Sequence, residues 1–243
     1  MTAGKTQGFT LIEMVMVVVI MGVMASIAMK SLKVSMDNSR FDATVAEMDK
    51  LSRAIVGDER LISNGMRTDF GYVGDIGALP ASLDDLMANP GYATWNGPYL
   101  QNDFAEDIDG FKLDAWNNPY SYSGGLSIIS SGAGEAITRN LAGSLSELTS
   151  NTVIGVVRDK SLSPPGDSAL QVTVSIVYPD GTGAYSSLST APGASGEFSF
   201  TGTIPIGVHQ IRAVANADTV TKYVPVYPGK SAHTELRFAR DKW

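Results

Sequence analysis

The sequence predicts an α+β protein in three parts: a long N-terminal helix, a small α+β head and a C-terminal all-β sandwich. Three observations lead to this organisation. An apolar run covers residues 9–29, turn residues recur at short intervals through residues 66–140, and short β-rich runs alternate with turns over residues 152–243. Each part is set apart by the pattern of its own residues.

The composition is that of a folded, acidic protein. Of the 243 residues, 44% are hydrophobic and 18% are charged, which is too apolar and too weakly charged for a disordered chain. The lack of cysteine excludes disulfides, thiolate metal sites and cysteine nucleophiles. The formal net charge of −7 argues against a nucleic-acid-binding protein, which usually presents a basic surface.

Residues 9–29 form the first element, an apolar stretch with one charged residue, Glu13. At a rise of about 1.5 Å per residue, the stretch is about 31 Å long and matches the hydrocarbon core of a bilayer. We therefore expect a transmembrane helix, because the apolar core of a cleavable secretory signal is shorter, about 7–15 residues. The carboxylate needs either a hydrated position near the headgroups or a cation from another chain.

The helix is expected to continue as an amphipathic segment over residues 31–63. Apolar residues recur on one helical face, and charged residues occupy the opposite face. Ser63-Asn64-Gly65 then predicts the end of the helix, so that residues 9–65 form one helical unit. The apolar face consists of Phe41, Val45, Met48, Leu51 and Ile55.

Glycine and proline interrupt residues 66–140 so often that long helices cannot form there. One short helix is expected at Ser82–Ala88, with strands at Tyr120–Tyr122 and Ser127–Ser130. This part is therefore expected to be a small, loop-rich head. Residues 141–151, which contain glycine and several serines, are expected to be a linker.

Residues 152–243 contain six short runs of the kind that form strands. In Val172–Tyr178, apolar β-branched residues alternate with threonine and serine, which predicts a strand with one buried face. Several such runs separated by proline- and glycine-containing turns predict a β-sandwich. The runs are Val153–Val157, Val172–Tyr178, Glu197–Thr201, His209–Ala215, Thr221–Val226 and His233–Phe238.

The N-terminus carries a specific motif. Gly8-Phe9-Thr10-Leu11-Ile12-Glu13, between a short polar segment and the apolar run, resembles the processing site of type IV prepilins and pseudopilins. The resemblance implies that a prepilin peptidase removes residues 1–8 by cleavage between Gly8 and Phe9, and that Phe9 is then N-methylated. It also implies that Glu13 pairs with the Phe9 amine of a neighbouring subunit during assembly.

Two loop segments of the head make the resemblance to a particular subfamily more specific. Trp95-Asn96-Gly97-Pro98-Tyr99-Leu100 and Asp114-Ala115-Trp116-Asn117-Asn118-Pro119-Tyr120 are similar to the head of the type II secretion major pseudopilin, so a pilin-like head is expected. Core packing, with prolines fixing the turns, is one interpretation of the large rings in these loops, and an exposed sugar-stacking platform is the other. The residues singled out are Trp95, Pro98, Tyr99, Trp116, Pro119 and Tyr120.

The resemblance also implies a calcium ion, which major pseudopilins hold near their last strands. The matching segment here, Gly132-Ala133-Gly134-Glu135, lacks the expected aspartate. The candidate ligands are instead Asp103, Asp107 and Asp109, because Asp107-x-Asp109-Gly110 resembles a calcium loop, although it lacks the spacing of an EF-hand. The alternative is a solvated acidic loop without metal.

The predicted sandwich is similar to carboxypeptidase regulatory-like, transthyretin-like domains. Ile154–Asp159, Gly196–Phe200 and Pro205–Ile211 carry this similarity. Ordinary major pseudopilins have no such domain, so the chain is expected to be a pseudopilin with an addition.

Catalysis is not expected. The two histidines of the chain, His209 and His233, lie in separate predicted strands without zinc-ligand spacing. The sequence has no Gly-x-Ser-x-Gly motif and no phosphate-binding loop.

The resemblance implies a structural role, as a pseudopilin that polymerises through its N-terminal helix into a periplasmic fibre for type II protein secretion. Two alternatives stay open. One is a surface type IV pilus pilin that displays an adhesive or binding sandwich, and the other is a membrane-anchored binding protein that does not polymerise. The expected partners are further copies of the chain, other pseudopilins, prepilin peptidase and an inner-membrane assembly platform. The chain is expected to cross the inner membrane once, with its C-terminal domains in the periplasm.

Overall fold

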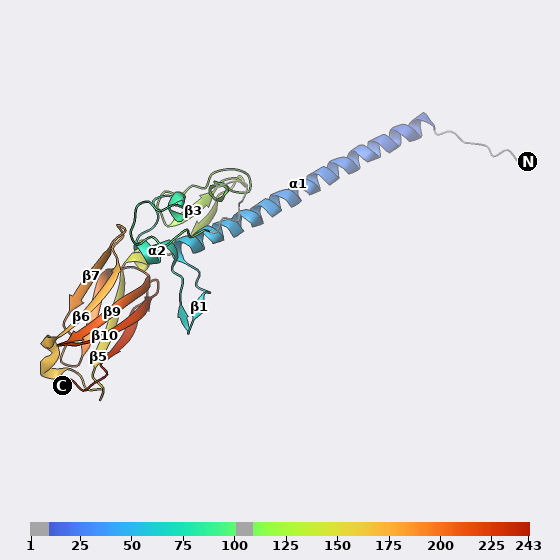
Figure 1. Cartoon of the computed structure of the whole chain (residues 1–243). Coiled ribbons are helices and arrows are strands. Elements are labelled where there is room, and N and C mark those ends of the chain that lie inside the picture. The colour runs from blue at the N-terminus through green and yellow to red at the C-terminus, as the bar shows by residue number, and fades with distance from the viewer. Residues whose placement is uncertain (1–9, 101–108) are drawn as a thin grey trace, which may run out of the picture.

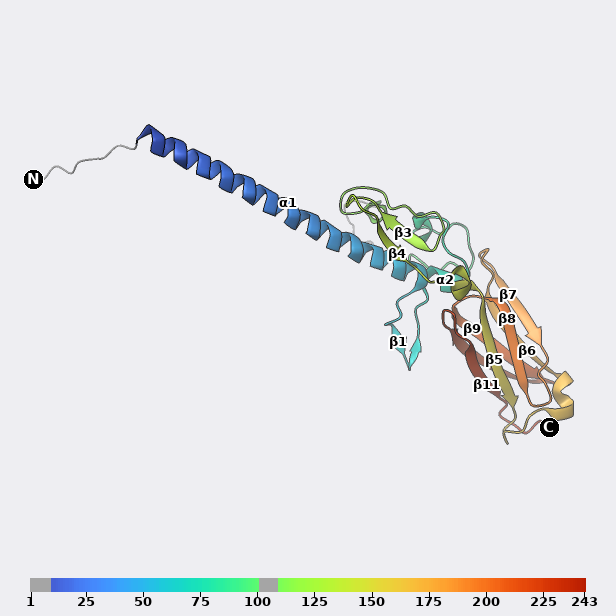
Figure 2. The same ribbon diagram turned by 180° about the vertical axis from the view of Figure 1, so that it is seen from behind.

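The computed structural model describes residues 10–100 and 109–243. One long helix, α1 (Leu11–Val56), projects from a body made of the head and the sandwich, and the C-terminus lies at the far tip of the sandwich (Figure 1). Seen from behind, the head lies along the last part of α1 and the sandwich continues beyond the end of the helix (Figure 2). The α+β class and the order of the three parts are as the sequence predicts.

The two ends of α1 have different surroundings. Every residue from Leu11 to Met36 is exposed, whereas Met48, Leu51 and Ile55 are buried in the core of the head. The apolar face predicted for this part of the helix is therefore the face that packs on the head. Phe41 is 45% exposed and lies before this contact begins.

α1 ends earlier than the sequence predicts. The helix stops at Val56, and Gly57 follows with a φ of 83°, a left-handed value that favours glycine. A Cβ atom on Gly57 would lie 2.4 Å from the carbonyl oxygen of Asp69, so the chain folds back on itself too closely for any other residue. The prediction that the helix continues to Ser63 is wrong for this reason.

The predicted helix stop is the turn of a hairpin. β1 (Ile62–Ser63) pairs with β2 (Met66–Arg67), and the hairpin stands out from the body beside the end of α1 (Figure 2). Asn64 and Gly65 connect the strands with φ values of 51° and 75°. A positive φ suits both a helix C-terminus and a two-residue hairpin, so the same residue types signal either structure.

The head is built from short elements around the end of α1. They are α2 (Gly71–Ile76), the 3-10 helices η1 (Leu83–Leu86) and η2 (Gly110–Lys112), and the antiparallel strands β3 (Ser127–Ser130) and β4 (Ile137–Asn140). The predicted helix at Ser82–Ala88 is present as η1, and β3 has its predicted bounds. The predicted strand at Tyr120–Tyr122 is wrong, because this segment makes only an isolated bridge from Ser121 to Ile129.

The C-terminal part is a β-sandwich, as predicted. A four-stranded sheet in the order β10-β9-β6-β7 packs against a three-stranded sheet in the order β11-β5-β8, with one apolar core between them. Each predicted run is a strand, and β11 is parallel to β5. The bounds are β5 (Asn151–Arg158), η3 (Gly166–Gln171), β6 (Val172–Pro179), β7 (Tyr185–Thr190), β8 (Glu197–Ile204), β9 (Gly207–Ala215), β10 (Asp218–Val226) and β11 (Ala232–Arg237).

The segment expected to be a linker is folded into the junction between head and sandwich. It contains α3 (Leu145–Thr149), whose Leu148 is 1% exposed and packs in the head core. Ile206, between β8 and β9, lies in the same core, and its N–H donates to the Leu148 carbonyl at 2.8 Å. The head and the sandwich therefore share apolar packing and are not joined by an exposed tether.

Candidate assembly site on the N-terminal helix

The start of α1 holds the predicted assembly residue, Glu13, and the residue that precedes the helix, Thr10. The N–H and the hydroxyl of Thr10 donate to Oε2 of Glu13 at 2.8 and 2.9 Å. In return, the Glu13 N–H donates to Oγ1 of Thr10 at 3.3 Å, which completes a capping box. The Glu13 side chain is therefore held against its own helix terminus. The predicted processing residues, Gly8 and Phe9, lie outside the described residues.

Thr10 is a helix-capping residue that the sequence analysis named only as part of the motif. A threonine three residues before a glutamate, at the start of an apolar run, is the signature of a capping box and could have identified it. Both bonds that Thr10 donates reach Oε2, and within residues 10–100 and 109–243 nothing donates to Oε1. One carboxylate oxygen of Glu13 is therefore available to a cation from another chain.

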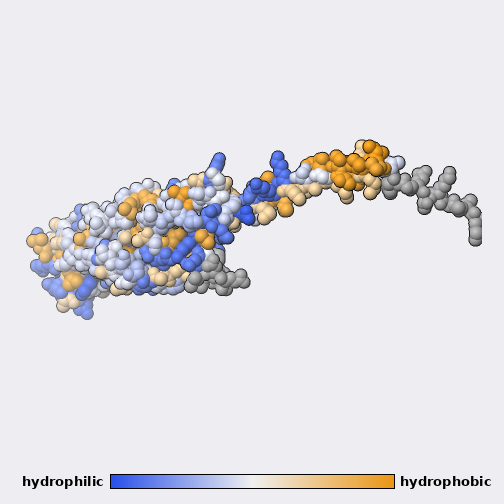
Figure 3. Space-filling view, turned by 90° about the horizontal axis from the view of Figure 1, so that it is seen from above, coloured by the Kyte–Doolittle hydropathy of each residue, from blue (hydrophilic) through white to orange (hydrophobic). Residues whose placement is uncertain are grey.

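The half of α1 that follows is apolar and uncovered. Leu11 is 83% exposed, and the exposed apolar surface continues to Met29. Among the described residues, α1 is the one helix that is long and apolar enough to cross a membrane. In the space-filling view this half forms a continuous hydrophobic surface that gives way to hydrophilic residues further along the helix (Figure 3). Such a surface is stable in lipid or against other helices.

Polar contacts fix the other half of α1 to the head. The Tyr120 hydroxyl donates to Oε2 of Glu47 at 3.0 Å, and Arg139 of β4 pairs with Asp49 at 3.2 Å. Burial raises the pKa of Glu47 above its ordinary value, although the Tyr120 hydrogen bond and the nearby Lys50 act in the opposite direction. The helix and the head are therefore joined by polar contacts as well as by apolar packing.

The loop aromatics of the head meet around Tyr99. Its ring packs edge-on against those of Tyr72 and Trp95, with centroids 5.5 and 5.6 Å away. The Tyr99 hydroxyl donates to Oδ2 of Asp75 at 2.9 Å, and the Trp95 Nε1–H donates to the Asp85 carbonyl at 2.8 Å. These rings and hydrogen bonds hold the loops of the head in one arrangement.

The other predicted head residues take different positions. Tyr120 is buried in the head core, and Pro98 follows a cis peptide bond from Gly97. Trp116 is half-buried and Pro119 is exposed. The structure therefore brings Trp95, Tyr99 and Tyr120 to the core of the head, and leaves Trp116 and Pro119 at its surface.

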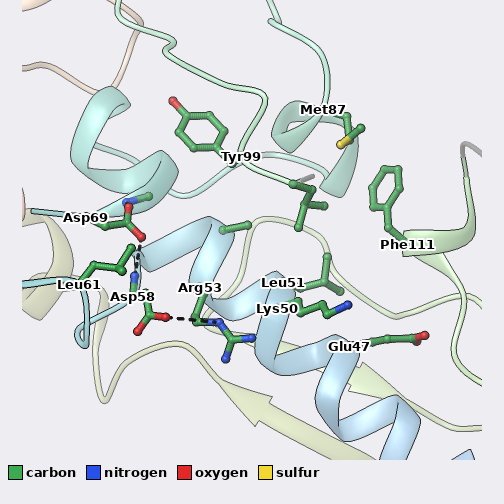
Figure 4. Close-up of a pocket in the computed structure, with 13 residues that line it drawn as sticks. Glu47, Lys50, Leu51, Arg53, Asp58, Leu61, Asp69, Met87, Tyr99 and Phe111 are labelled. Carbon is green, nitrogen blue, oxygen red and sulfur yellow. Dashed lines mark hydrogen bonds and ion pairs between the residues drawn. The ribbon is translucent and has the colours of Figure 1, made fainter. Parts of the chain in front are cut away.

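A pocket of about 520 Å³ lies between α1 and the head loops (Figure 4). Leu51 and Phe111 contribute apolar surface to it. On the rim, Arg53 pairs with Asp58 at 3.8 Å, and the Asp58 N–H donates to Oδ2 of Asp69 at 2.7 Å. The described residues that line the pocket include no serine, threonine or cysteine.

One candidate calcium ligand, Asp109, lies among the described residues, where it is held in an ion pair. The Asp109 carboxylate pairs with Lys112 at 2.9 Å, and Lys112 also pairs with Asp84, so an ammonium group already neutralises these carboxylates. Within residues 10–100 and 109–243, no group of three or more acidic or histidine side chains could hold a metal. The other candidate ligands, Asp103 and Asp107, lie outside the described residues.

Asp114 has a structural role that the sequence did not reveal. It is 3% exposed and accepts four hydrogen bonds, from the Ser130 hydroxyl at 2.6 Å and from the N–H groups of Gly132, Trp116 and Asn118 at 3.2, 2.9 and 2.9 Å. Burial alone would raise its pKa, but these donors together hold the pKa of Asp114 below its ordinary value. An aspartate at the start of a turn that contains two asparagines could have indicated this role from the sequence.

Two solved structures show a weak likeness to the chain. The dioxygenase domain of a dioxygenase carbohydrate-binding protein fusion from Streptomyces sp. SirexAA-E has a TM-score of 0.32 at 17% identity, covering 41% of this chain and 86% of that chain. A candidate carbohydrate-binding protein from Pseudomonas aeruginosa has a TM-score of 0.25 at 15% identity, covering 37% of this chain and 90% of that chain. At these TM-scores neither likeness bears on function.

Two sequence comparisons agree with the geometry of α1 and the head. Residues 4–29 match the prokaryotic N-terminal methylation motif. A stretch of 119 residues is 30% identical to the type II secretion system core protein G of Pseudomonas aeruginosa, covering 49% of this chain and 73% of that protein. The chain therefore belongs to the type IV pilin-like family as a relative of the major pseudopilin, core protein G, and carries an additional C-terminal β domain.

Proposed function

We propose that the protein is a structural pseudopilin that polymerises through α1 into a periplasmic fibre for type II protein secretion. The observation that carries this proposal is the contrast within α1. Residues 11–36 are exposed, whereas Met48, Leu51 and Ile55 are buried in the head. A helix that is fixed at one end and uncovered at the other suits exchange between the bilayer and the helices of neighbouring subunits. The relationship to core protein G supports the same role.

We propose that processing and assembly of the subunit begin in the inner membrane. Prepilin peptidase cleaves between Gly8 and Phe9 on the cytoplasmic side and removes residues 1–8, and Phe9 is N-methylated. The head and the sandwich lie in the periplasm. An inner-membrane assembly platform then adds the subunit to a fibre that contains further copies of the chain and other pseudopilins. The match to the N-terminal methylation motif supports this processing.

In the proposed fibre, Glu13 sets the register between subunits. Thr10 orients the carboxylate through Oε2, so Oε1 faces a partner's cation, which is the methylated Phe9 amine of the neighbour. An unpaired charge in hydrocarbon costs several kcal/mol, about 3 or more, so this pairing favours one arrangement of neighbouring helices over shifted ones.

The experiment expresses the full chain with prepilin peptidase and the type II assembly machinery. Intact mass should show loss of residues 1–8 and gain of one methyl group. Glu13→Gln and Glu13→Ala should insert into the membrane like the wild type but lower the yield of sheared fibres by about tenfold or more. Asp42→Asn, a loss of charge at an exposed site on the polar part of α1, is the matched control and should assemble normally.

Two results would contradict the proposal. One is a chain that stays unprocessed beside an active peptidase, and the other is a wild-type fibre yield from Glu13→Ala. Assembly by type IV pilus machinery and not by the type II machinery would instead assign the chain to a surface pilus.

A further inference from the structure

A cleft of about 600 Å³ lies where the head meets the outer face of the four-stranded sheet. The sheet contributes the floor, and loops of the head on both sides of α2 form one wall. Neither the processing site nor the apolar half of α1 takes part in it. The lining residues used below are Asp75, Asn96, Tyr99, Tyr185, Gln210 and Tyr223.

Strand pairing places two tyrosines on opposite sides of this cleft. Tyr185 is on the edge strand β7, and Tyr223 is on the opposite edge strand β10. Tyr223 pairs with Gln210 of β9, and Gln210 pairs with Val177 of β6, so these three residues form one row across the sheet. Tyr185 pairs with Pro179, which lies two residues from Val177 on the same face of β6. Three strand spacings of about 4.8 Å, or about 14 Å, separate the two edge strands, and the two-residue offset places the tyrosines about 7 Å apart along the strand direction.

Both tyrosine rings are open to solvent. Tyr185 is 68% exposed and Tyr223 is 61% exposed, although most large apolar side chains of the sandwich are buried. A tyrosine ring presents a flat apolar face and a polar edge, and two such rings beside one cleft form a surface on which a flat, partly apolar molecule can stack.

Polar groups of fixed orientation lie between the rings. The Gln210 amide donates to the Tyr223 hydroxyl at 3.2 Å, which leaves the Gln210 carbonyl oxygen and the hydroxyl hydrogen of Tyr223 for a ligand. On the head side, the Tyr99 hydroxyl accepts from the Asn96 N–H at 3.1 Å and donates to Oδ2 of Asp75 at 2.9 Å. Among the described residues nothing donates to Oδ1 of Asp75, so this oxygen is an acceptor that a ligand hydroxyl can use.

The charges of the cleft limit the ligand. Asp69 and Asp75 line it, and the lining residues that the structure describes include no lysine or arginine. Asp69 is already occupied, because its two oxygens accept from the N–H groups of Asp58 and Gly71 at 2.7 and 3.0 Å. An anionic ligand would meet the Asp75 carboxylate without a lining lysine or arginine to offset the repulsion.

The floor of the cleft is the face of a sheet and not its edge. β6 and β9 are each paired on both sides, so their main-chain groups are used and cannot bind a peptide by strand addition. Side-chain rings, amides and one carboxylate remain as the means of recognition. Sugar rings offer what these groups bind, namely flat C–H faces for stacking and hydroxyls for directed hydrogen bonds.

We propose that the cleft between the head and the sandwich binds a short neutral oligosaccharide, with sugar faces on Tyr185 and Tyr223 and hydroxyls on Gln210 and Asp75. This site is separate from the assembly site at Glu13. It does not depend on fibre formation, because every group named lies in the head or the sandwich.

The test uses the full chain in a detergent without a sugar headgroup. Calorimetric titration should show binding of at least one of four neutral hexasaccharides: β-1,4-linked glucose, β-1,4-linked N-acetylglucosamine, β-1,4-linked mannose or α-1,4-linked glucose. For the sugar that binds, Tyr185→Ala and Tyr223→Ala should each weaken affinity by about tenfold, which is about 1.4 kcal/mol, because each variant loses a ring contact. Tyr223→Phe keeps the ring and should weaken affinity less.

Phe41→Ala is the matched control, because it removes an exposed ring from α1, outside the cleft, and should leave affinity unchanged. Unchanged melting temperatures show that the variants fold. The proposal is overturned if none of the four sugars binds at millimolar concentration, or if both tyrosine-to-alanine variants bind the sugar with the affinity of the wild type. It is also overturned if an oligogalacturonate or a proline-rich peptide is the ligand whose binding depends on these tyrosines. None of these outcomes concerns assembly, so the two proposals fail independently.

Discussion

The Tyr120 hydroxyl of the head and the Glu47 carboxylate of α1 form a hydrogen bond of 3.0 Å at the place where the helix begins to pack on the head. Tyr120 is buried and Glu47 is half-buried, so water cannot fully replace this bond if it is lost. The contact joins two residues that are far apart in the sequence, and it helps to hold α1 on the head.

Tyr120→Phe keeps the ring in the core and leaves the Glu47 carboxylate without this donor. We expect the free energy of unfolding to fall by about 1–3 kcal/mol. Thermal unfolding of the full chain in detergent measures the change. Tyr185→Phe, which removes a hydroxyl from an exposed ring, should change the stability by less than about 0.5 kcal/mol. If the two variants lost the same free energy of unfolding, the hydrogen bond to Glu47 would contribute no more to stability than an exposed hydroxyl.

Asp114 should make the head sensitive to acid. Its pKa is held below the ordinary 3.8, so its contribution to stability is present above that value and is lost as the pH falls through the lower folded value. Asp114→Asn turns an NH2 donor toward the donors Ser130 and Gly132, and should lower the free energy of unfolding at pH 7 by about 2–4 kcal/mol. When the pH is lowered to about 3, the free energy of unfolding of Asp114→Asn should fall by less than that of the wild type.

Melting temperatures at the two pH values measure both effects of Asp114→Asn. Asp42→Asn is the control, because it removes an exposed carboxylate from α1. A wild-type melting temperature for Asp114→Asn at neutral pH would refute the role of the four hydrogen bonds.

Gly77 should tolerate no side chain, because the head contacts the sandwich there. Its φ is 85°, and a Cβ atom would lie 2.4 Å from the carbonyl oxygen of Pro179. Gly77→Ala should therefore destabilise the chain by about 2–4 kcal/mol, as measured by thermal unfolding. Gly91 also has a positive φ, 104°, but no atom lies within 4 Å of its Cβ position. Gly91→Ala should lower the stability only by the cost of the left-handed backbone conformation, about 1 kcal/mol. A similar cost at Gly77 would mean that the head and the sandwich are not tightly packed there.

Leu148 should link the stability of the head to that of the sandwich. It is 1% exposed in the head core, whereas Leu145 on the same short helix is 50% exposed. Leu148→Ala should cost about 2–5 kcal/mol and Leu145→Ala less than about 0.5 kcal/mol. Denaturant unfolding should show one transition for head and sandwich together. Two separate transitions, with only one shifted by Leu148→Ala, would show that the two parts fold independently.

The sequence by itself determined the features that depend on local pattern. The apolar run that begins near Phe9 specifies a membrane-length helix by its length alone. The strands of the sandwich follow from alternation over a few residues, as in Val172–Tyr178, and the family follows from a contiguous motif that ends at Glu13. β7 was missed because its serines leave Leu188 as the one large apolar residue that packs inward.

Only the tertiary structure decided features that depend on residues far apart in the chain. Gly57 ends α1 because Asp69 returns against it, and Leu148 became a core residue because Ile206 of the sandwich packs beside it. The four donors of Asp114 and the cleft between Tyr185 and Tyr223 likewise come from separate segments. Local pattern fixes periodicity and turn chemistry, but which surfaces meet is set by the burial of apolar area across the whole fold.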